Sequence, residues 1–176
     1  MSAGIVRSFA FLDLCGFTQY MDARGAAAAA ARLAEMRATV RRCSGQHSVR
    51  VAKWLGDGSM LVAVDSAALV DCVAEIWREV PPGTSLPLRG GMASGEVLIF
   101  EGDDYIGHAV NIAARLCAEA APGQLLATVE CDPGHRLPVT SMRLRGVAVP
   151  LRVLSIESAD ARLDVLQAER PGGSIS

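Results

Sequence analysis

The apolar positions of the chain fall into short runs that are separated by glycine, proline and charged residues. The run from Val6 to Leu14 is followed by a glycine turn, which is typical of a strand that leads into a helix. Two further runs, Ser48–Trp54 and Ser59–Val64, flank a turn with two glycines and predict a hairpin. The first part of the chain therefore supplies strands that can pair with one another.

Three stretches repeat their apolar residues with the period of an α-helix. The first contains the alanine run Ala26–Ala31, whose small side chains permit close packing on a sheet. The predicted helices are residues 18–44, ended by Gly45, residues 66–79, capped by Asp65, and about His108–Glu119.

The other apolar runs predict shorter strands. They are Leu86–Ser94 and Glu96–Phe100, bent at Gly95, followed by Gln124–Val129, Ser141–Arg145 and Pro150–Ile156, which we expect to cover one sheet. The order of elements, βαββαββαβ, predicts an α+β sandwich of the ferredoxin-like βαββαβ kind with additional C-terminal strands. We expect one domain over residues 1–157 and a polar tail over residues 158–176, with a short helix at Ala159–Ala168.

Composition narrows the class of protein. No apolar run approaches the ~20 residues of a membrane span, and no leader-like segment precedes the first strand, so we expect a cytoplasmic protein. The net charge of −2 without a basic run argues against nucleic acid or a membrane surface as partner. The five scattered cysteines lack the spacing of a zinc site or a disulfide framework.

Two aspartates are the first candidates for chemistry. Asp13 ends the first apolar run, and Asp57 occupies the two-glycine turn of the predicted hairpin. A single acid at a strand end is commonly a turn or cap residue, and this interpretation of Asp13 stays open. If the first strand lies beside the hairpin, the two carboxylates converge. Two carboxylates in such proximity favour the binding of a hard cation, such as Mg²⁺ or Mn²⁺ carrying a phosphate.

Three other residues complete the candidate set. Lys53 is the single lysine among 17 basic residues, which indicates a position where a compact ammonium is preferred over a guanidinium, although a chance lysine on a strand is the alternative. Asn111 and Arg115 lie four residues apart on the third predicted helix and share a face. This pair either lies on the solvated side of the helix or binds a phosphate near the helix N-terminus.

Five segments of the chain together resemble the catalytic domains of class III nucleotide cyclases, over about residues 9–156. They appear in the family's order: Phe11–Thr18, Lys53–Gly58, Leu88–Met92, Asp104–Arg115 and Leu144–Gly146. The resemblance implies the fold of these domains and an adenylyl cyclase that converts ATP into 3′,5′-cyclic AMP and pyrophosphate with two divalent cations, Mg²⁺ or Mn²⁺. It also implies a homodimer whose two active sites are shared between protomers.

The resemblance assigns roles position by position. Asp13 and Asp57 match the two metal-binding aspartates, with the Leu14 carbonyl as a further ligand. Arg89 matches an arginine that holds the terminal phosphates from the same protomer as the aspartates. The other protomer would supply residues that read adenine, orient the ribose and stabilise the α-phosphate. These are Lys53 and Asp104 for adenine, Asn111 for the ribose and Arg115 for the α-phosphate.

The chain departs from the family pattern at two positions. Arg145 stands where the family often has a phosphate-binding lysine, and Ile106 stands where many relatives have an aromatic residue. Asp103 is an alternative to Asp104, but its distance from Gly107 in the sequence fits the family less well. Two other functions stay open at this point: a guanylyl cyclase, and a catalytically silent nucleotide-binding dimer that regulates a partner.

Overall fold

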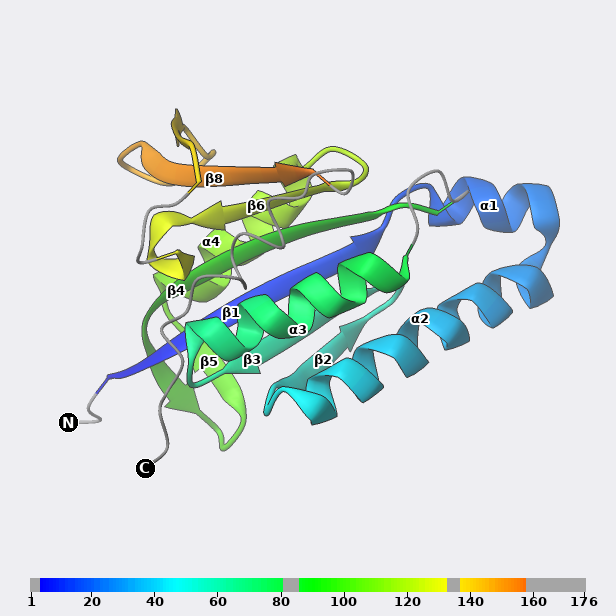
Figure 1. Cartoon of the computed structure of the whole chain (residues 1–176), viewed down its shortest axis with the longest axis horizontal. Helices are drawn as coiled ribbons and strands as arrows, with labels where there is room; N and C mark the ends of the chain where they lie inside the picture. The colour runs from blue at the N-terminus through cyan, green and yellow to red at the C-terminus, as the bar shows by residue number, and fades with distance from the viewer. Residues whose placement is uncertain (1–3, 81–85, 133–136, 158–176) are drawn as a thin grey trace, which may run out of the picture.

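A computed structural model describes residues 4–80, 86–132 and 137–157 of the chain. The described residues form an eight-stranded sheet with helices on both faces (Figure 1). The predicted tail over residues 158–176, with its helix at Ala159–Ala168, lies outside the described residues, so the domain boundary at residue 157 stays a prediction.

The first strand, β1 (Ile5–Leu14), lies inside the sheet and pairs antiparallel with β3 (Gly58–Ala63) on one side and β4 (Leu88–Phe100) on the other. The strand β2 (Arg50–Leu55) forms the edge beyond β3. The resulting order β2-β3-β1-β4 is that of a ferredoxin-like sheet, which confirms the predicted α+β class.

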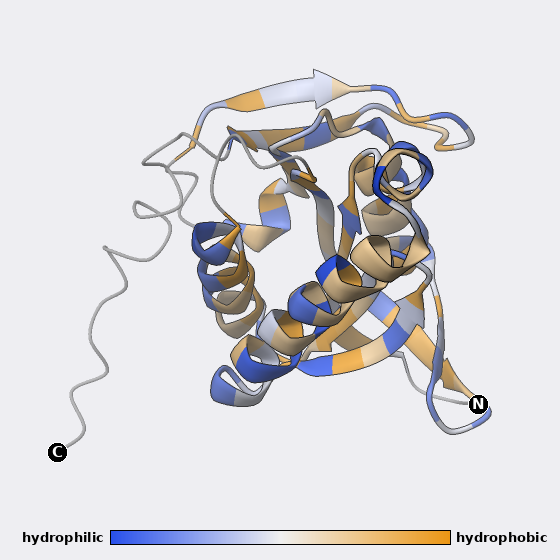
Figure 2. Ribbon diagram, turned by 90° about the vertical axis from the view of Figure 1, so that its right-hand side faces the viewer, coloured by the Kyte–Doolittle hydropathy of each residue, from blue (hydrophilic) through white to orange (hydrophobic). Residues whose placement is uncertain are grey.

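One face of the sheet is covered by α2 (Ala26–Gln46) and α3 (Ser66–Glu79), and the other by α4 (His108–Glu119) (Figure 1). Asp65 caps α3 as predicted, because its Oδ1 accepts a hydrogen bond of 3.0 Å from the Ala67 amide. Hydrophilic residues lie along the outward sides of the helices (Figure 2). No helix in the described part of the chain is long and apolar enough to cross a membrane.

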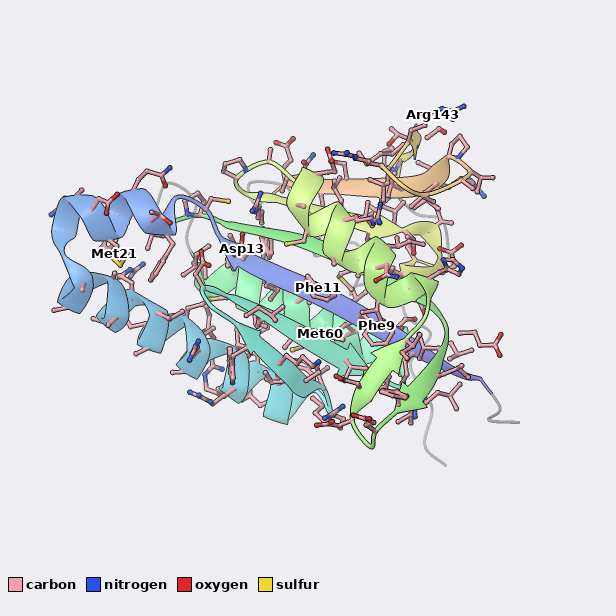
Figure 3. All side chains as sticks on the ribbon, turned by 180° about the vertical axis from the view of Figure 1, so that it is seen from behind. Phe9, Phe11, Asp13, Met21, Met60 and Arg143 are labelled. Carbon is pink, nitrogen blue, oxygen red and sulfur yellow. The ribbon has the colours of Figure 1, made fainter. Side chains whose placement is uncertain are left out.

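Alternate residues of β1 face opposite sides of the sheet. Leu12 and Leu14 belong to the core beneath α2 and α3, whereas Phe9 and Phe11 belong to the core beneath α4. Asp13 continues this second series, as Figure 3 shows from the α4 side. The alternation therefore directs the Asp13 carboxylate toward the face that α4 covers.

The α4 helix packs directly on the backbone of β4 at Gly91. A Cβ atom at this position would overlap the Ala113 carbonyl and the Cys117 amide. Only glycine permits this approach, which fixes α4 against the central strands.

Two helix boundaries differ from the sequence expectations. The helix predicted over residues 18–44 is divided into α1 (Phe17–Arg24) and α2, because Gly25 adopts a φ of 87° and interrupts it. The α2 helix also continues through Gly45 to Gln46, and the left-handed residue that follows it is Ser48, with a φ of 56°.

The later strands also differ. The predicted pair Leu86–Ser94 and Glu96–Phe100 is one continuous strand, β4, in which Gly95 lies opposite Arg7 and against the Ala109 side chain without breaking the strand. The C-terminal strands extend the sheet beyond β4 instead of covering it. The strand β6 (Gln124–Thr128) is parallel to β4, and it is followed in the sheet by β8 (Leu151–Glu157) and β7 (Val139–Met142). The strand β7 both begins and ends earlier in the chain than the predicted strand Ser141–Arg145.

Candidate active site

The predicted pair of acids is brought together at the end of β1. Asp13 lies opposite Gly58 of β3 and Arg89 of β4 in the strand register. Asp57 directly precedes Gly58, in a turn that Gly56 enters with a φ of 65°. A Cβ atom on Gly58 would lie 2.9 Å from the Leu12 carbonyl oxygen and 3.3 Å from Asp13 Oδ1, so glycine lets the hairpin approach β1 closely.

The Arg89 guanidinium binds one of these acids. Its Nε and Nη2 donate to Asp13 Oδ2 at 2.9 and 2.8 Å, and its Nη1 donates to the Ala118 carbonyl of α4 at 3.3 Å. Both side chains are partly buried, with exposed fractions of 33% for Arg89 and 24% for Asp13. A charge-assisted pair in this setting is held more firmly than a surface ion pair.

Burial raises the pKa of Asp57, and the neighbouring Asp13 carboxylate raises it further. The positive charge of Arg89 acts in the opposite direction but does not cancel these effects. The end of β1 is therefore a place where an additional cation would be favoured by electrostatics.

These residues line an open cleft of about 390 Å³. Asp13, Asp57 and Arg89 line it together with the residues that lead into α1. Gly16 precedes this helix with a φ of 75°, and the first backbone amides of a helix favour anions. The cleft thus combines oxygen ligands for a cation with donors for a phosphate.

A second pair joins Lys53 and Asp104. The Lys53 ammonium forms an ion pair with Asp104 Oδ1, and the two side chains are 48% and 46% exposed. Asp104 begins β5 (Asp104–Ile106), which pairs with the end of β4. A bulge in β2 between Val51 and Lys53 shifts the register immediately before the lysine, and bulges commonly redirect a side chain in this way.

Asn111 and Arg115 both lie on the exposed side of α4, whereas Ala109, Ala113 and Leu116 of the same helix are buried. The predicted shared face is therefore present. The Arg115 guanidinium lies against Gly146, where any Cβ atom would collide with it. Arg145 is exposed at the same edge of the domain, next to this glycine.

Comparison with curated proteins finds relatives in mycobacteria. An uncharacterized protein of Mycobacterium tuberculosis is 36% identical over 132 residues, which are 73% of this chain and 34% of that protein. The pH-sensitive adenylate cyclase of the same species is 36% identical over 118 residues, 66% of this chain and 29% of that protein. The chain thus spans about a third of the length of these relatives. No protein-family model matches it.

Solved structures with the same fold are nucleotide cyclases. An adenylate cyclase from Trypanosoma brucei in its monomeric state superposes with a TM-score of 0.76 at 20% identity, covering 89% of this chain and 90% of that chain. The guanylyl cyclase Cya2 superposes with a TM-score of 0.75 at 20% identity, covering 88% and 92%. The chain has the fold of a class III nucleotide cyclase catalytic domain.

Within one copy of this domain, the candidate residues form separate groups. The cleft at Asp13 is not lined by Lys53, Asp104, Asn111 or Arg115. Tyr105, next to Asp104, packs edge-on against Phe9 at 5.2 Å between ring centroids. Phe9 precedes Asp13 by four strand residues, or about 13 Å at ~3.3 Å per residue. The Lys53–Asp104 pair is therefore separate from the cleft at Asp13.

The cleft also includes residues to which the sequence assigned no role. Phe17 and Thr18, from the matched segment Phe11–Thr18, and Gln19 after it line the cleft at the start of α1. A helix that begins directly after a candidate metal ligand could have indicated these residues. The amides of a first helical turn have no partners within the helix and can donate to a ligand beside it.

Proposed function

We propose that this domain is an adenylyl cyclase that converts ATP into 3′,5′-cyclic AMP and pyrophosphate. The observation that carries the proposal is the Lys53–Asp104 ion pair, present on a cyclase fold. An ammonium donates to a ring nitrogen of adenine, and a carboxylate accepts from its exocyclic amine. Guanine offers an oxygen acceptor at the place of that amine, which Asp104 would repel.

The residues at the end of β1 fit divalent cations. The Asp13 and Asp57 carboxylates and the Leu14 carbonyl are hard oxygen donors that line one cleft, and the pKa of Asp57 is already raised by burial and by Asp13. Two bound Mg²⁺ or Mn²⁺ ions would lower the pKa of the ribose 3′-hydroxyl and neutralise the triphosphate.

The chain's own residues would hold the substrate for in-line attack. The 3′-hydroxyl gives up its proton to water as its oxygen forms a bond to the α-phosphorus. The bond from this phosphorus to the bridging oxygen breaks, and pyrophosphate leaves with that oxygen. Asn111 orients the ribose, and Arg115 meets the charge that develops on the α-phosphate. Arg89 and Arg145 hold the terminal phosphates, where a guanidinium forms two parallel hydrogen bonds.

A two-fold homodimer would bring the separate groups together, with Asp13, Asp57 and Arg89 from one protomer facing Lys53, Asp104, Asn111 and Arg115 from its partner. An exposed apolar surface on the β4–β5 hairpin supports this arrangement, because apolar patches beside a site indicate an interface. The hairpin projects beyond the sheet (Figure 1). Its exposed apolar residues are Leu98, Ile99, Phe100 and Ile106.

The test is a product assay on purified protein with ATP or GTP, each with Mg²⁺ or Mn²⁺. We expect cyclic AMP and pyrophosphate in equal amounts and a higher kcat/KM for ATP than for GTP. Cyclic GMP as the main product would make the domain a guanylyl cyclase, as the similar fold of Cya2 permits. Nucleotide binding without pyrophosphate release would identify a silent regulatory dimer.

A further inference from the structure

The β2–β3 hairpin carries two candidate site residues, Lys53 and Asp57, but it lies at the edge of the sheet. Only β3 pairs with β2 among the described strands, and the tip residues Leu55 and Gly56 are exposed. A glycine-containing tip on an edge strand opens readily unless another element restrains it. The position of Asp57 therefore depends on what holds this tip.

The α2 helix provides that restraint. Arg37 Nη2 donates a hydrogen bond of 2.9 Å to the Gly56 carbonyl oxygen. The same guanidinium lies over the Trp54 ring at 5.0 Å from its centroid, and that of Arg41, one helical turn further, lies over the ring at 4.9 Å. Arg37 thus contacts both the tip carbonyl and the tryptophan before it, and Arg41 contacts the same tryptophan.

The carbonyl that Arg37 binds belongs to the peptide group between Gly56 and Asp57. Because a peptide group is planar, fixing its oxygen also fixes the orientation of the Asp57 amide and the start of the Asp57 backbone. Gly56 has no side chain of its own and adopts a φ of 65°, so this external hydrogen bond is an important constraint on the turn.

Arg37 is also held at some cost. Its Nε is buried and has no hydrogen-bond partner among the described residues. A buried donor without a partner is unfavourable, and a surface arginine with only a solubilising role would not need to adopt this position.

We propose that Arg37 is a positioning residue for the Asp57 carboxylate, acting through the Gly56 carbonyl, and that Arg41 supports it by holding Trp54. This inference rests on the proposed function, in which Asp57 binds a divalent cation. Groups that orient a metal ligand commonly change metal affinity or activity by about 10–100-fold when removed. The effect should therefore fall on the metal and not on the affinity for ATP.

The first measurement needs no enzymatic activity. Hydrogen exchange of the amides in residues 56–58 is compared in wild type, Arg37→Ala, Arg37→Lys and Arg41→Ala. Arg32→Ala serves as the control, because Arg32 is on the same helix and pairs with Glu35 instead. We expect faster exchange at the tip in Arg37→Ala, a smaller increase in Arg41→Ala, and partial protection by lysine, which keeps a donor.

The second measurement is Mn²⁺ affinity in the presence of a non-cyclisable ATP analogue, followed by the electron spin resonance of free Mn²⁺. We expect Arg37→Ala to weaken Mn²⁺ binding by ~10-fold or more, with Arg37→Lys between it and wild type and Arg32→Ala unchanged. In the cyclase assay, the KM for ATP at saturating Mn²⁺ should stay within about twofold of wild type, as expected for a residue that acts only through the metal site.

The proposal is overturned if Mn²⁺ affinity in Arg37→Ala and Arg41→Ala equals that of wild type, or if Arg32→Ala weakens it equally. Should Arg37→Ala not fold, Arg37→Lys and Arg41→Ala decide the question by the same two measurements. A wild-type protein that binds Mn²⁺ through Asp57 but forms no cyclic nucleotide would refute the proposed function, while weaker Mn²⁺ binding in the Arg37 variants would still support the positioning role.

Discussion

Asp57 shows at the scale of a single residue how a site can oppose stability. Burial raises its pKa, and the Asp13 charge adds to the increase. A folded-state pKa above the unfolded value means that protonation favours the folded state. This stabilisation is fully present below the ordinary aspartate pKa and is lost as pH rises through the raised value. At neutral pH the ionised carboxylate therefore destabilises the fold.

Replacing Asp57 by asparagine should raise the melting temperature at pH 7 in chelator-containing buffer, while abolishing cyclisation. We expect a small rise, because the neutral amide avoids both the burial cost of the charge and its repulsion by Asp13. The difference should disappear at acidic pH, where Asp57 is protonated. Thermal unfolding at both pH values measures it, with Asp103→Asn in the exposed turn as control. A lower melting temperature at pH 7 would contradict the prediction.

The second prediction about a single residue concerns Arg89. Its two hydrogen bonds to Asp13 Oδ2 occupy an oxygen that a cation would use. Without nucleotide, Arg89→Ala should therefore bind Mn²⁺ more tightly than wild type, by up to ~10-fold for the removal of one nearby positive charge. With an ATP analogue the order should reverse, because the terminal phosphates lose their arginine.

Calorimetric titration of Mn²⁺ with and without the analogue tests this reversal. Arg7→Ala is the matched control, since Arg7 is on the neighbouring strand and its Nη1 donates to the Val6 carbonyl oxygen. Weaker Mn²⁺ binding by nucleotide-free Arg89→Ala would show that the arginine assists the metal site instead of competing with it.

At the scale of elements, the glycines show where sequence patterns reach their limit. Gly25 interrupts a predicted helix, Gly45 lies within one, and Gly95 lies in an unbroken strand. Locally all three are breakers of regular structure. A tertiary contact accounts for Gly95, which leaves room for Ala109, and no local pattern encodes that contact. The space around Gly25 and Gly45 is open, so no such contact separates these two. The strand and helix periods predicted β1, the β2–β3 hairpin and α4 because their patterns are strong and local.

The features of the candidate site also divide into those that a local pattern predicts and those that depend on packing between elements. The convergence of Asp13 and Asp57 followed from the strand and hairpin pattern, and the register of β1 and β3 confirms it. The meeting of Lys53 with Asp104 joins two elements that are distant in sequence, and only the family resemblance pointed to it. The bulge before Lys53 and the contact of Arg37 with Gly56 depend on packing between elements and were not predicted.

The prediction about contacts between elements concerns the Lys53–Asp104 pair. Replacing Lys53 by glutamate and Asp104 by glycine should shift preference from ATP toward GTP, because a carboxylate accepts from the ring N–H and amine of guanine. We expect the ratio of kcat/KM for ATP over GTP to fall by at least about tenfold, as is common when a polar contact is mismatched. Asp103→Gly is the control. An unchanged ratio would show that the pair does not read the base.

At the scale of the whole molecule, one chain holds every candidate residue but does not gather them. The cleft with the acids lies at one end of β1, and Lys53 and Asp104 do not line it, whereas Tyr105, next to Asp104, packs on Phe9 of the same strand. The apolar hairpin beside Asp104 is exposed. A two-fold dimer with shared sites would account for both the separated residues and the exposed hairpin. The contact that covers the hairpin would also complete two equivalent sites.

Shared sites predict that two inactive variants rescue each other when mixed. Asp57→Ala keeps an intact Asn111 and Arg115 half, and Asn111→Ala keeps intact aspartates. In a mixed dimer one site receives both defects and the other receives neither. Random pairing of equal amounts makes about half of the dimers mixed, each with one working site, so about a quarter of wild-type activity should return if the two sites act independently.

The measurement is cyclic AMP formation by the co-refolded mixture, compared with each variant alone. Two different affinity tags, one on each variant, allow mixed dimers to be isolated and counted. Purified mixed dimers should show about half of wild-type activity, because one of their two sites is complete. As a control, mixing Asp57→Ala with Asp13→Ala should restore nothing if each site draws both acids from one protomer, because every site then lacks one of them. Mixed Asp57→Ala and Asn111→Ala dimers without activity would mean that each site is built within one chain.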